Sequence, residues 1–256
     1  MHPILLKIGS FNIYSYPVLL FLGFALGTIL FFSQAKRERI NKRKIFFFPL
    51  YIMIYAIVGA RIFYILNYPY QFLENPQDIL KIWKGGVVFY GGFLFALGGG
   101  TIYIKRHKLS FWKIANISAP SIALGISIGR IGCFLNGCCY GKPWSKGLVF
   151  SFNSPAGRAF PGQPLIPTQL ISSADMFAVF LVLSIFKKHQ WLKDRNFLWF
   201  VFFYSLHRFI IDFLRADSLR IFLNLTFSQL VSLIMGISAI ALMLLKSSFK
   251  PDVFDS

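Results

Sequence analysis

The sequence is short of charge, and of negative charge above all. Asp and Glu occupy 9 of its 256 positions against 27 for Lys and Arg, and charged residues together make up only 14%. An ordinary soluble domain carries about 25% charged residues. Hydrophobic residues, by contrast, reach 56%, and phenylalanine alone fills 31 positions. This composition excludes an ordinary soluble globular chain and indicates a membrane protein.

The sequence also lacks any stretch that reads as a soluble domain. It has no internal repeat and no low-complexity tract. The longest interval between apolar runs, 139–169, is rich in Gly, Pro and Ser, as loops are. We therefore expect one transmembrane domain that covers residues 1–256.

Seven apolar runs approach the length of about 20 residues that crosses roughly 30 Å of hydrocarbon. The first run has no signal-peptide cleavage pattern before the basic residues that follow it, so we interpret it as a helix. The fold class predicted is all-α, a polytopic membrane protein with about seven transmembrane helices. The runs lie at 11–33, 45–67, 86–104, 114–138, 170–186, 197–214 and 226–245.

The net charge of +18 follows the spans instead of forming a nucleic-acid surface. The intervals 34–44, 105–113, 187–196 and 246–256 hold 16 Lys and Arg, and the alternate intervals hold 8. The side of a membrane protein with more basic loops faces the cytoplasm. The charge bias therefore predicts an N-terminus outside and a C-terminus in the cytoplasm, and we expect no nucleic-acid partner.

Three arginines lie inside the apolar runs: Arg61, Arg130 and Arg208. A guanidinium in hydrocarbon costs roughly 2.5–3.5 kcal/mol on insertion scales, so each needs a partner or a wet cavity. The structural alternative for each is interfacial snorkelling or an internal ion pair. Three such residues in one chain favour a functional site.

Charged residues gather around Arg208 in the stretch YSLHRFIIDFLRADS. Asp212 and Arg215 share its helix face, so Asp212 is a counter-ion candidate for either arginine. His207 points about 100° away and is as compatible with packing as with proton transfer. Asp175 near the start of another run reads best as a charge that the helix dipole favours.

Glycines surround Arg130 in SIGRIGCFLNGCCYGKPW, at 129, 132, 137 and 141. Glycine lets the backbone approach a ligand closely, and a broken helix turns its N–H groups towards an anion. A guanidinium beside them binds phosphate in a bidentate way. A second glycine-rich stretch, KGGVVFYGGFLFALGGG, places Tyr90 before Gly91 and Gly92. Its last three glycines are compatible with close helix packing alone.

The chain has only three cysteines, Cys133, Cys138 and Cys139. Structural zinc takes four ligands at known spacings, and neither a C-x-x-C motif nor a nearby histidine completes a set here. We therefore predict no metal site. Two interpretations of the cysteines stay open: they are small buried side chains, or Cys133 and Cys138 form a disulfide. An unpaired thiol here is open to alkylation or oxidation.

These features together resemble the prolipoprotein diacylglyceryl transferase family over nearly the whole chain. The most specific match is GRIGCFLNGCCYGKP, which resembles the signature segment of the family. VGARIFYILNYPYQF followed by KIWKGGVVFYGG resembles a second block. IPTQL and HRFIIDFLR resemble later blocks, and IYSYPVLLFLGF resembles the opening helix.

The resemblance implies a reaction in the bacterial cytoplasmic (inner) membrane. The thiol of a lipobox cysteine on a prolipoprotein attacks the glycerol carbon of phosphatidylglycerol, and glycerol 1-phosphate leaves. Negative charge develops on the departing phosphate, where a guanidinium in a low-dielectric cavity is most effective. The implied partners are phosphatidylglycerol, the lipobox segment and the membrane, and no cofactor is implied.

The resemblance also implies the site residues. Arg130 and Arg208 are the predicted catalytic cations, with Arg61 in support, and both catalytic arginines are expected to reach one phosphate. Tyr90 is a catalytic candidate because it stands where many members have a histidine. The predicted substrate-binding residues are Tyr16, Arg61, Gly91, Gly92, Arg130, Gly132, Asn136, Gly137, Gln169 and Asp212.

The chain departs from the family pattern at several polar positions. Cys133 and Cys138 stand where members commonly have asparagine and an acid, and Ile171 and Ser172 replace a Tyr-Glu pair. The phenol of Tyr90 is a weaker resting base than imidazole, although it can relay a proton. Two alternatives therefore stay open: a homologue that binds lipid without chemistry, and a transporter of an anionic solute.

Overall fold

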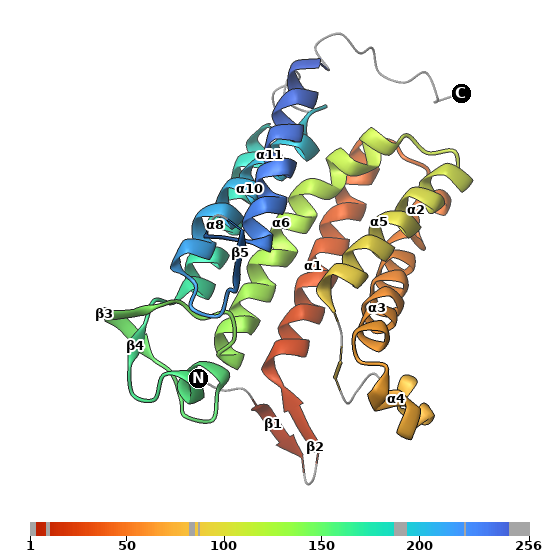
Figure 1. The fold of residues 1–256 in the computed structure, drawn as a ribbon. Helices are drawn as coiled ribbons and strands as arrows, with labels where there is room; N and C mark the ends of the chain where they lie inside the picture. Colours follow the sequence, from red (N-terminus) through yellow and green to blue (C-terminus); the bar gives the residue numbers. More distant parts are fainter. Residues whose placement is uncertain are drawn as a thin grey trace. The chain divides into compact units, whose positions relative to one another are not determined.

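The computed structural model describes residues 4–8, 11–81, 85–86, 88–186, 194–222 and 224–245. Contacts group the chain into two compact units, Met1–Gln34 with Ala115–Pro251 and Ala35–Ile114 with Asp252–Ser256. Helices dominate both units (Figure 1).

The first unit holds most of the elements. Its helices α8, α10 and α11 run side by side (Figure 1). The elements are β1 (Ile4–Ile8), β2 (Phe11–Tyr14), α1 (Ser15–Arg37), α6 (Phe111–Asn136), β3 (Pro143–Val149), α7 (Pro155–Ala159), β4 (Pro164–Leu165), α8 (Thr168–Phe186), α10 (Asn196–Leu214), β5 (Arg220–Phe222), β6 (Leu225–Thr226) and α11 (Phe227–Leu245).

Small residues let two helices of this unit approach closely. A Cβ on Gly23 of α1 would lie 2.8 Å from the carbonyl oxygen of Gly125 on α6, and one on Gly27 would lie 3.0 Å from that of Ser121. Backbones this close leave no room for a larger side chain. Elsewhere α6, α8 and α10 meet around the buried side chains Ala119, Ala123, Leu183 and Phe200.

The second unit is built on the packing of α3 against α5. Its elements are α2 (Lys42–Ile45), α3 (Phe48–Asn67), α4 (Tyr70–Glu74), η1 (Pro76–Ile79) and α5 (Phe89–Arg106). Gly59 of α3 faces Gly91 of α5, and a Cβ on either would come 2.5 Å from the carbonyl oxygen of the other. Close packing therefore explains these glycines.

Six helices are long and apolar enough to cross a membrane: Ser15–Arg37, Lys42–Asn67, Phe111–Asn136, Thr168–Phe186, Asn196–Leu214 and Phe227–Leu245. Apolar side chains on them point outward, with Phe21 69% and Ile237 66% exposed, as lipid-facing residues do. The chain is therefore a multi-pass membrane protein. The predicted run at 86–104 corresponds to α5, which is helical over 18 residues but is not among the six. Its five glycines dilute its apolar character, so the count of about seven stays a prediction.

Two helices begin or end a few residues inside the predicted apolar runs. The first run was predicted to be helical from residue 11, but Phe11–Tyr14 forms β2 and pairs antiparallel with β1. The fourth run was predicted to continue to residue 138, but α6 ends at Asn136. Gly137 has a φ of 72°, and it donates to Phe134 O while Cys138 donates to Cys133 O. These are the two hydrogen bonds of a Schellman turn, which terminates the helix.

Interval 139–169 forms a small structured region and not an irregular loop. Strands β3 and β4 pair antiparallel, and Phe150, Ala156 and Leu165 form a buried cluster with α7. Gly137 belongs to this packing, because a Cβ there would lie 2.6 Å from the Cβ of Ser154. The segment after α6 is therefore held in place by the interval that follows it.

Candidate active site

The segment that follows α6 is fixed by hydrogen bonds from α8. Thr168 Oγ1 donates to the carbonyl oxygen of Cys139 at 2.7 Å, and Gln169 Nε2 donates to that of Cys138 at 2.8 Å. Both donors are completely buried. Cys139 has a φ of 59°, a conformation that non-glycine residues adopt only when their surroundings enforce it.

The same segment is tied to the end of α10. Gly141 forms an antiparallel bridge with Arg215, Lys142 N donates to Leu214 O at 2.8 Å, and Ala216 N donates to Tyr140 O at 3.2 Å. We call this connection the Gly141–Arg215 bridge. It joins the end of the helix that carries Arg130 to the end of the helix that carries Arg208.

Arg130 stands apart from the other cations of this unit. Its side chain is half-buried, and among the described residues its guanidinium has no hydrogen-bond or ion-pair partner. Its charge nevertheless acts on Tyr16, Cys139, His207 and Arg208. Arg130 and Arg208 therefore belong to one electrostatic group in one unit.

Arg208, by contrast, has protein partners. Its Nη2 lies 3.3 Å from Asp212 Oδ1 and donates to Ser228 Oγ at 3.0 Å. Asp212 also lies 3.8 Å from Arg215 Nη1 and accepts a 2.6 Å hydrogen bond from Thr226 Oγ1. The helix spacing had predicted Asp212 as a counter-ion for either arginine, and it contacts both.

Arg215 is held most firmly by a second carboxylate. Its Nε and Nη2 donate to the two carboxylate oxygens of Asp217, each at 2.9 Å. This bidentate pair neutralises Arg215, as Asp212 neutralises Arg208. Among the described arginines of this group, Arg130 is then the one whose charge no carboxylate offsets.

The prediction for Asp175 was wrong. It lies two turns into α8, and the first turn of that helix has no acidic residue. Its Oδ2 instead lies 2.9 Å from His207 Nδ1. His207 is 8% exposed, and its Nε2 is buried without a hydrogen-bond partner among the described residues. A carboxylate that holds one ring nitrogen fixes the orientation of the imidazole.

The remaining substrate-binding candidates of this unit lie around Arg130. Gly132 packs against Leu19 and Tyr16 of α1, where an added Cβ would come within 3.4 Å of both side chains. Asn136 is the last residue of α6, and Gly137 forms the turn after it. Gln169 uses its amide nitrogen to hold Cys138, and its Oε1 is buried with no partner among the described residues.

The three cysteines meet at one point. Their sulfur atoms all lie within 4.8 Å of one another, and all three are free thiols, so the Cys133–Cys138 disulfide is not formed. Hydrogen bonds from the thiols of Cys133 and Cys138, with the charges of Arg215 and Arg130, lower the pKa of Cys139 from its usual range. A single negative charge, on Cys139, is therefore favoured within the cluster.

The second unit holds Arg61, Tyr90, Gly91 and Gly92. Arg61 is 8% exposed and donates to four main-chain carbonyls: Ile79 O at 3.0 Å, Gly85 O at 2.8 Å, Gly86 O at 2.9 Å, and Asp78 O. Its guanidinium therefore organises the segment before α5. Tyr90 lies in the first turn of α5 and is 38% exposed. Gly91 and Gly92 are buried against α3, and their role in substrate binding stays a prediction.

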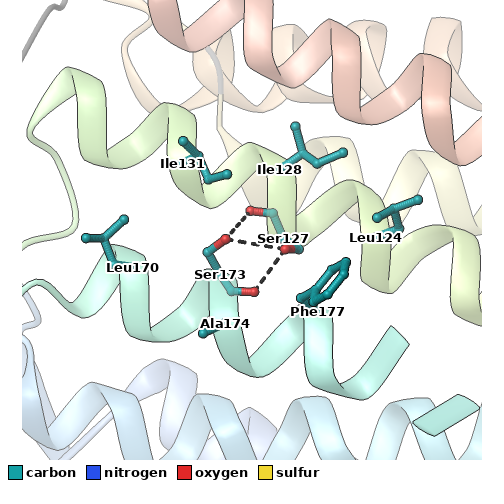
Figure 2. Close-up of a pocket in the computed structure, with 8 residues that line it drawn as sticks. All are labelled: Leu124, Ser127, Ile128, Ile131, Leu170, Ser173, Ala174 and Phe177. Atoms are coloured by element: carbon teal, nitrogen blue, oxygen red, sulfur yellow. Dashed lines mark hydrogen bonds between the residues drawn. The ribbon is translucent and has the colours of Figure 1, made fainter. Parts of the chain in front are cut away.

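An apolar groove opens between α6 and α8. It has a volume of about 550 Å³, and its polar surface comes from Ser127 and Ser173, which hydrogen-bond each other across the two helices (Figure 2). Neither Arg130 nor Arg208 lines it, but Ser127 lies one helical turn before Arg130. The lining residues are Leu124, Ser127, Ile128, Ile131, Leu170, Ser173, Ala174 and Phe177.

Comparison with known proteins agrees with the resemblance. The family model described as "Prolipoprotein diacylglyceryl transferase" matches residues 3–245. The chain is 31% identical over 250 residues to a phosphatidylglycerol–prolipoprotein diacylglyceryl transferase of Bacillus velezensis, covering 96% of this chain and 92% of the relative. The protein of that name from Bacillus licheniformis is 33% identical, with 94% and 91% covered. The one from Staphylococcus aureus is 31% identical, with 94% and 87% covered. The chain thus belongs to the prolipoprotein diacylglyceryl transferase family.

Proposed function

We infer that this chain transfers the diacylglyceryl group of phosphatidylglycerol to the thiol of a prolipoprotein cysteine. The products are a thioether-linked lipid and glycerol 1-phosphate, and the reaction is the first step of lipoprotein maturation. Family membership and the names of relatives that match over nearly their whole length support this inference. They favour an enzyme over a transporter of an anionic solute.

The observation that carries the mechanism is the state of Arg130. A guanidinium that is half-buried and has no protein partner among the described residues suits an anionic ligand. The phosphate of the lipid supplies that anion. As the bond from the glycerol carbon to the phosphate oxygen breaks, the oxygen keeps the electron pair, and Arg130 stabilises the growing charge. Arg208, held by Asp212, is a second guanidinium of the same group and can donate hydrogen bonds to the phosphate.

The incoming thiol must lose its proton as sulfur attacks the glycerol carbon. Tyr90 remains the family-position candidate for the proton relay. His207 is a second candidate, because Asp175 orients it and its Nε2 has no described partner. Tyr90 lies in the second unit and His207 in the first, so variants of the two test separate elements.

The apolar groove between α6 and α8 suits an acyl chain of the lipid substrate. It begins about one helical turn from Arg130, and its side chains are almost all apolar (Figure 2). A lipid whose phosphate lies at Arg130 could place an acyl chain in this groove. The chain would bury apolar surface there without breaking any hydrogen bond of the protein.

We further propose seven spans in a single domain of the bacterial cytoplasmic (inner) membrane, with α5 as the seventh. Support comes from the tight glycine packing of α5 on α3 and from the basic bias of 16 against 8 between alternate intervals. An odd number of spans puts the two termini on opposite sides, and the basic bias then favours an N-terminus outside and a C-terminus in the cytoplasm. The lipobox segment of the precursor would then enter from the outer side.

The test is a transfer assay with purified protein, phosphatidylglycerol vesicles and a lipobox peptide. Wild-type protein should form the thioether product, and Arg130→Ala should lower the rate by about 10²–10³-fold, as loss of one charge-stabilising donor does. Arg158→Ala is the matched control, because Arg158 is an exposed arginine of the same unit. Lipid binding without product would identify an inactive homologue, and anion flux without product would identify a transporter.

A further inference from the structure

The three-thiol cluster of Cys133, Cys138 and Cys139 has the form of a metal site. The sulfur atoms lie within 4.8 Å of one another, and no fourth Cys, His, Asp or Glu among the described residues joins them. Zn²⁺ with thiolate ligands has Zn–S distances of about 2.3 Å, which puts the sulfurs of a tetrahedral site about 3.8 Å apart. Small side-chain rotations bring the three thiols to that spacing.

The backbone holds these thiols in a convergent arrangement. The Schellman turn at Gly137 folds the chain back, so that Cys138 returns to Cys133, five residues earlier. Cys139 then turns inward through its left-handed backbone conformation, which Thr168 fixes by binding its carbonyl oxygen at 2.7 Å. The thiols are therefore preorganised before any ligand arrives, as ligands of a metal site must be.

The surroundings and the ligands both bear on which ion fits. Three thiolates with Zn²⁺ have a net charge of −1, and Arg130, on the same helix as Cys133, has no carboxylate partner among the described residues. Thiolate ligands select soft d¹⁰ ions over Mg²⁺ or Ca²⁺, which prefer oxygen. Structural zinc sites use four protein ligands, whereas three protein ligands are typical of sites that also bind a substrate or water.

We propose that Cys133, Cys138 and Cys139 bind Zn²⁺ and that the fourth coordination position takes the incoming substrate thiol. This second part rests on the proposed function. The thiol binds as a thiolate and releases its proton to water, because a metal-bound thiol is deprotonated. Its sulfur then attacks the glycerol carbon, the carbon–oxygen bond breaks, and the phosphate leaves with the electron pair. The resulting thioether is a weak ligand and departs from the metal.

The first experiment measures metal content, with protein purified under reducing conditions that keep all three thiols free. Because these are the only cysteines in the chain, a thiol titration reports on the cluster alone. We expect one Zn²⁺ per chain in the wild type and at least a tenfold loss of affinity in Cys139→Ser. Zinc content that is absent from the wild type, or unchanged in the triple serine variant, would overturn the proposal.

The second experiment replaces Zn²⁺ with Co²⁺, whose absorption spectrum reports thiolate ligands. A lipobox peptide with cysteine should change the spectrum of the cobalt protein, and the same peptide with serine should leave it unchanged. The same spectral change with both peptides, or no change with either, would overturn the fourth-ligand role. The readout requires no turnover, so it is also valid in Arg130→Ala. Transfer activity by metal-free protein would refute this proposal while leaving the proposed function intact.

Discussion

Arg130 and Arg208 are expected to respond differently when each is changed to alanine. Arg130 has no protein partner among the described residues, so Arg130→Ala should change the free energy of unfolding by no more than about 0.5 kcal/mol. Arg208 lies 3.3 Å from Asp212, whose side chain is 0% exposed. Arg208→Ala leaves that buried carboxylate with Arg215 at 3.8 Å, and breaking a buried pair costs about 3–5 kcal/mol.

The two variants should nevertheless share a loss of transfer activity. Each removes a positive charge from the group that we assign to the departing phosphate. The expected loss for Arg130→Ala is about 2.7–4 kcal/mol of transition-state stabilisation. Arg130 then affects chemistry alone, whereas Arg208 affects both chemistry and stability.

Thermal unfolding in detergent, measured beside the transfer assay, separates these effects. About 2–4 °C per kcal/mol is expected for a chain of this size, so Arg208→Ala should lower Tm by roughly 6–20 °C. Arg130→Ala and the control Arg158→Ala should unfold with the wild type. A Tm loss for Arg130→Ala as large as that for Arg208→Ala would show that Arg130 is a structural residue, and near-normal transfer by Arg130→Ala would refute its role.

Three further predictions test other parts of the site. Gly137→Ala should destabilise the protein by about 1–3 kcal/mol, because the new Cβ would lie 2.6 Å from the Cβ of Ser154 and the backbone has a φ of 72°. Gly162→Ala is the control, because Gly162 has a φ of 68° but open space around it, and this variant should lower Tm by less. Tyr90→Phe should lower kcat by about 10²-fold or more if the phenol relays the proton, and unchanged kcat would exclude it. Ala174→Phe should fill the groove between α6 and α8 and shift preference towards shorter acyl chains by several-fold, seen in competition between lipids. Equal use of both chain lengths would show that the groove does not hold the substrate.

Local spacing made part of the site predictable. Arg208, Asp212 and Arg215 lie within eight residues of one helix, so helix geometry alone places them together, and the structure confirms their contacts. The helices were equally predictable from the sequence, because an apolar run long enough to span a bilayer can satisfy its backbone hydrogen bonds there in few ways other than as a helix. Each of the seven predicted runs contains a helix.

Contacts between distant residues were not predictable in this way. His207 and Asp175 are 32 residues apart, and the dipole explanation for Asp175 used only its own helix. The meeting of all three thiols was not predicted, because the spacing of 133, 138 and 139 matches no helical or zinc-binding repeat and the meeting depends on the turn at Gly137. Ser228 gave no signal either, since a single hydroxyl in an apolar run has many uses.

The hydrogen bonds of Arg61 determine which substitutions the protein tolerates around it. Its guanidinium recognises carbonyl oxygens, which every amino acid supplies, so its contacts place no demand on the side chains of the four residues that accept them. The exceptions are Gly85 and Gly86, whose φ values of 88° and 78° suit no other residue well. A saturation-mutagenesis library should therefore tolerate broad replacement at Asp78 and Ile79 while it rejects every substitution of Arg61, lysine included, because an ammonium group has three donors for four acceptors.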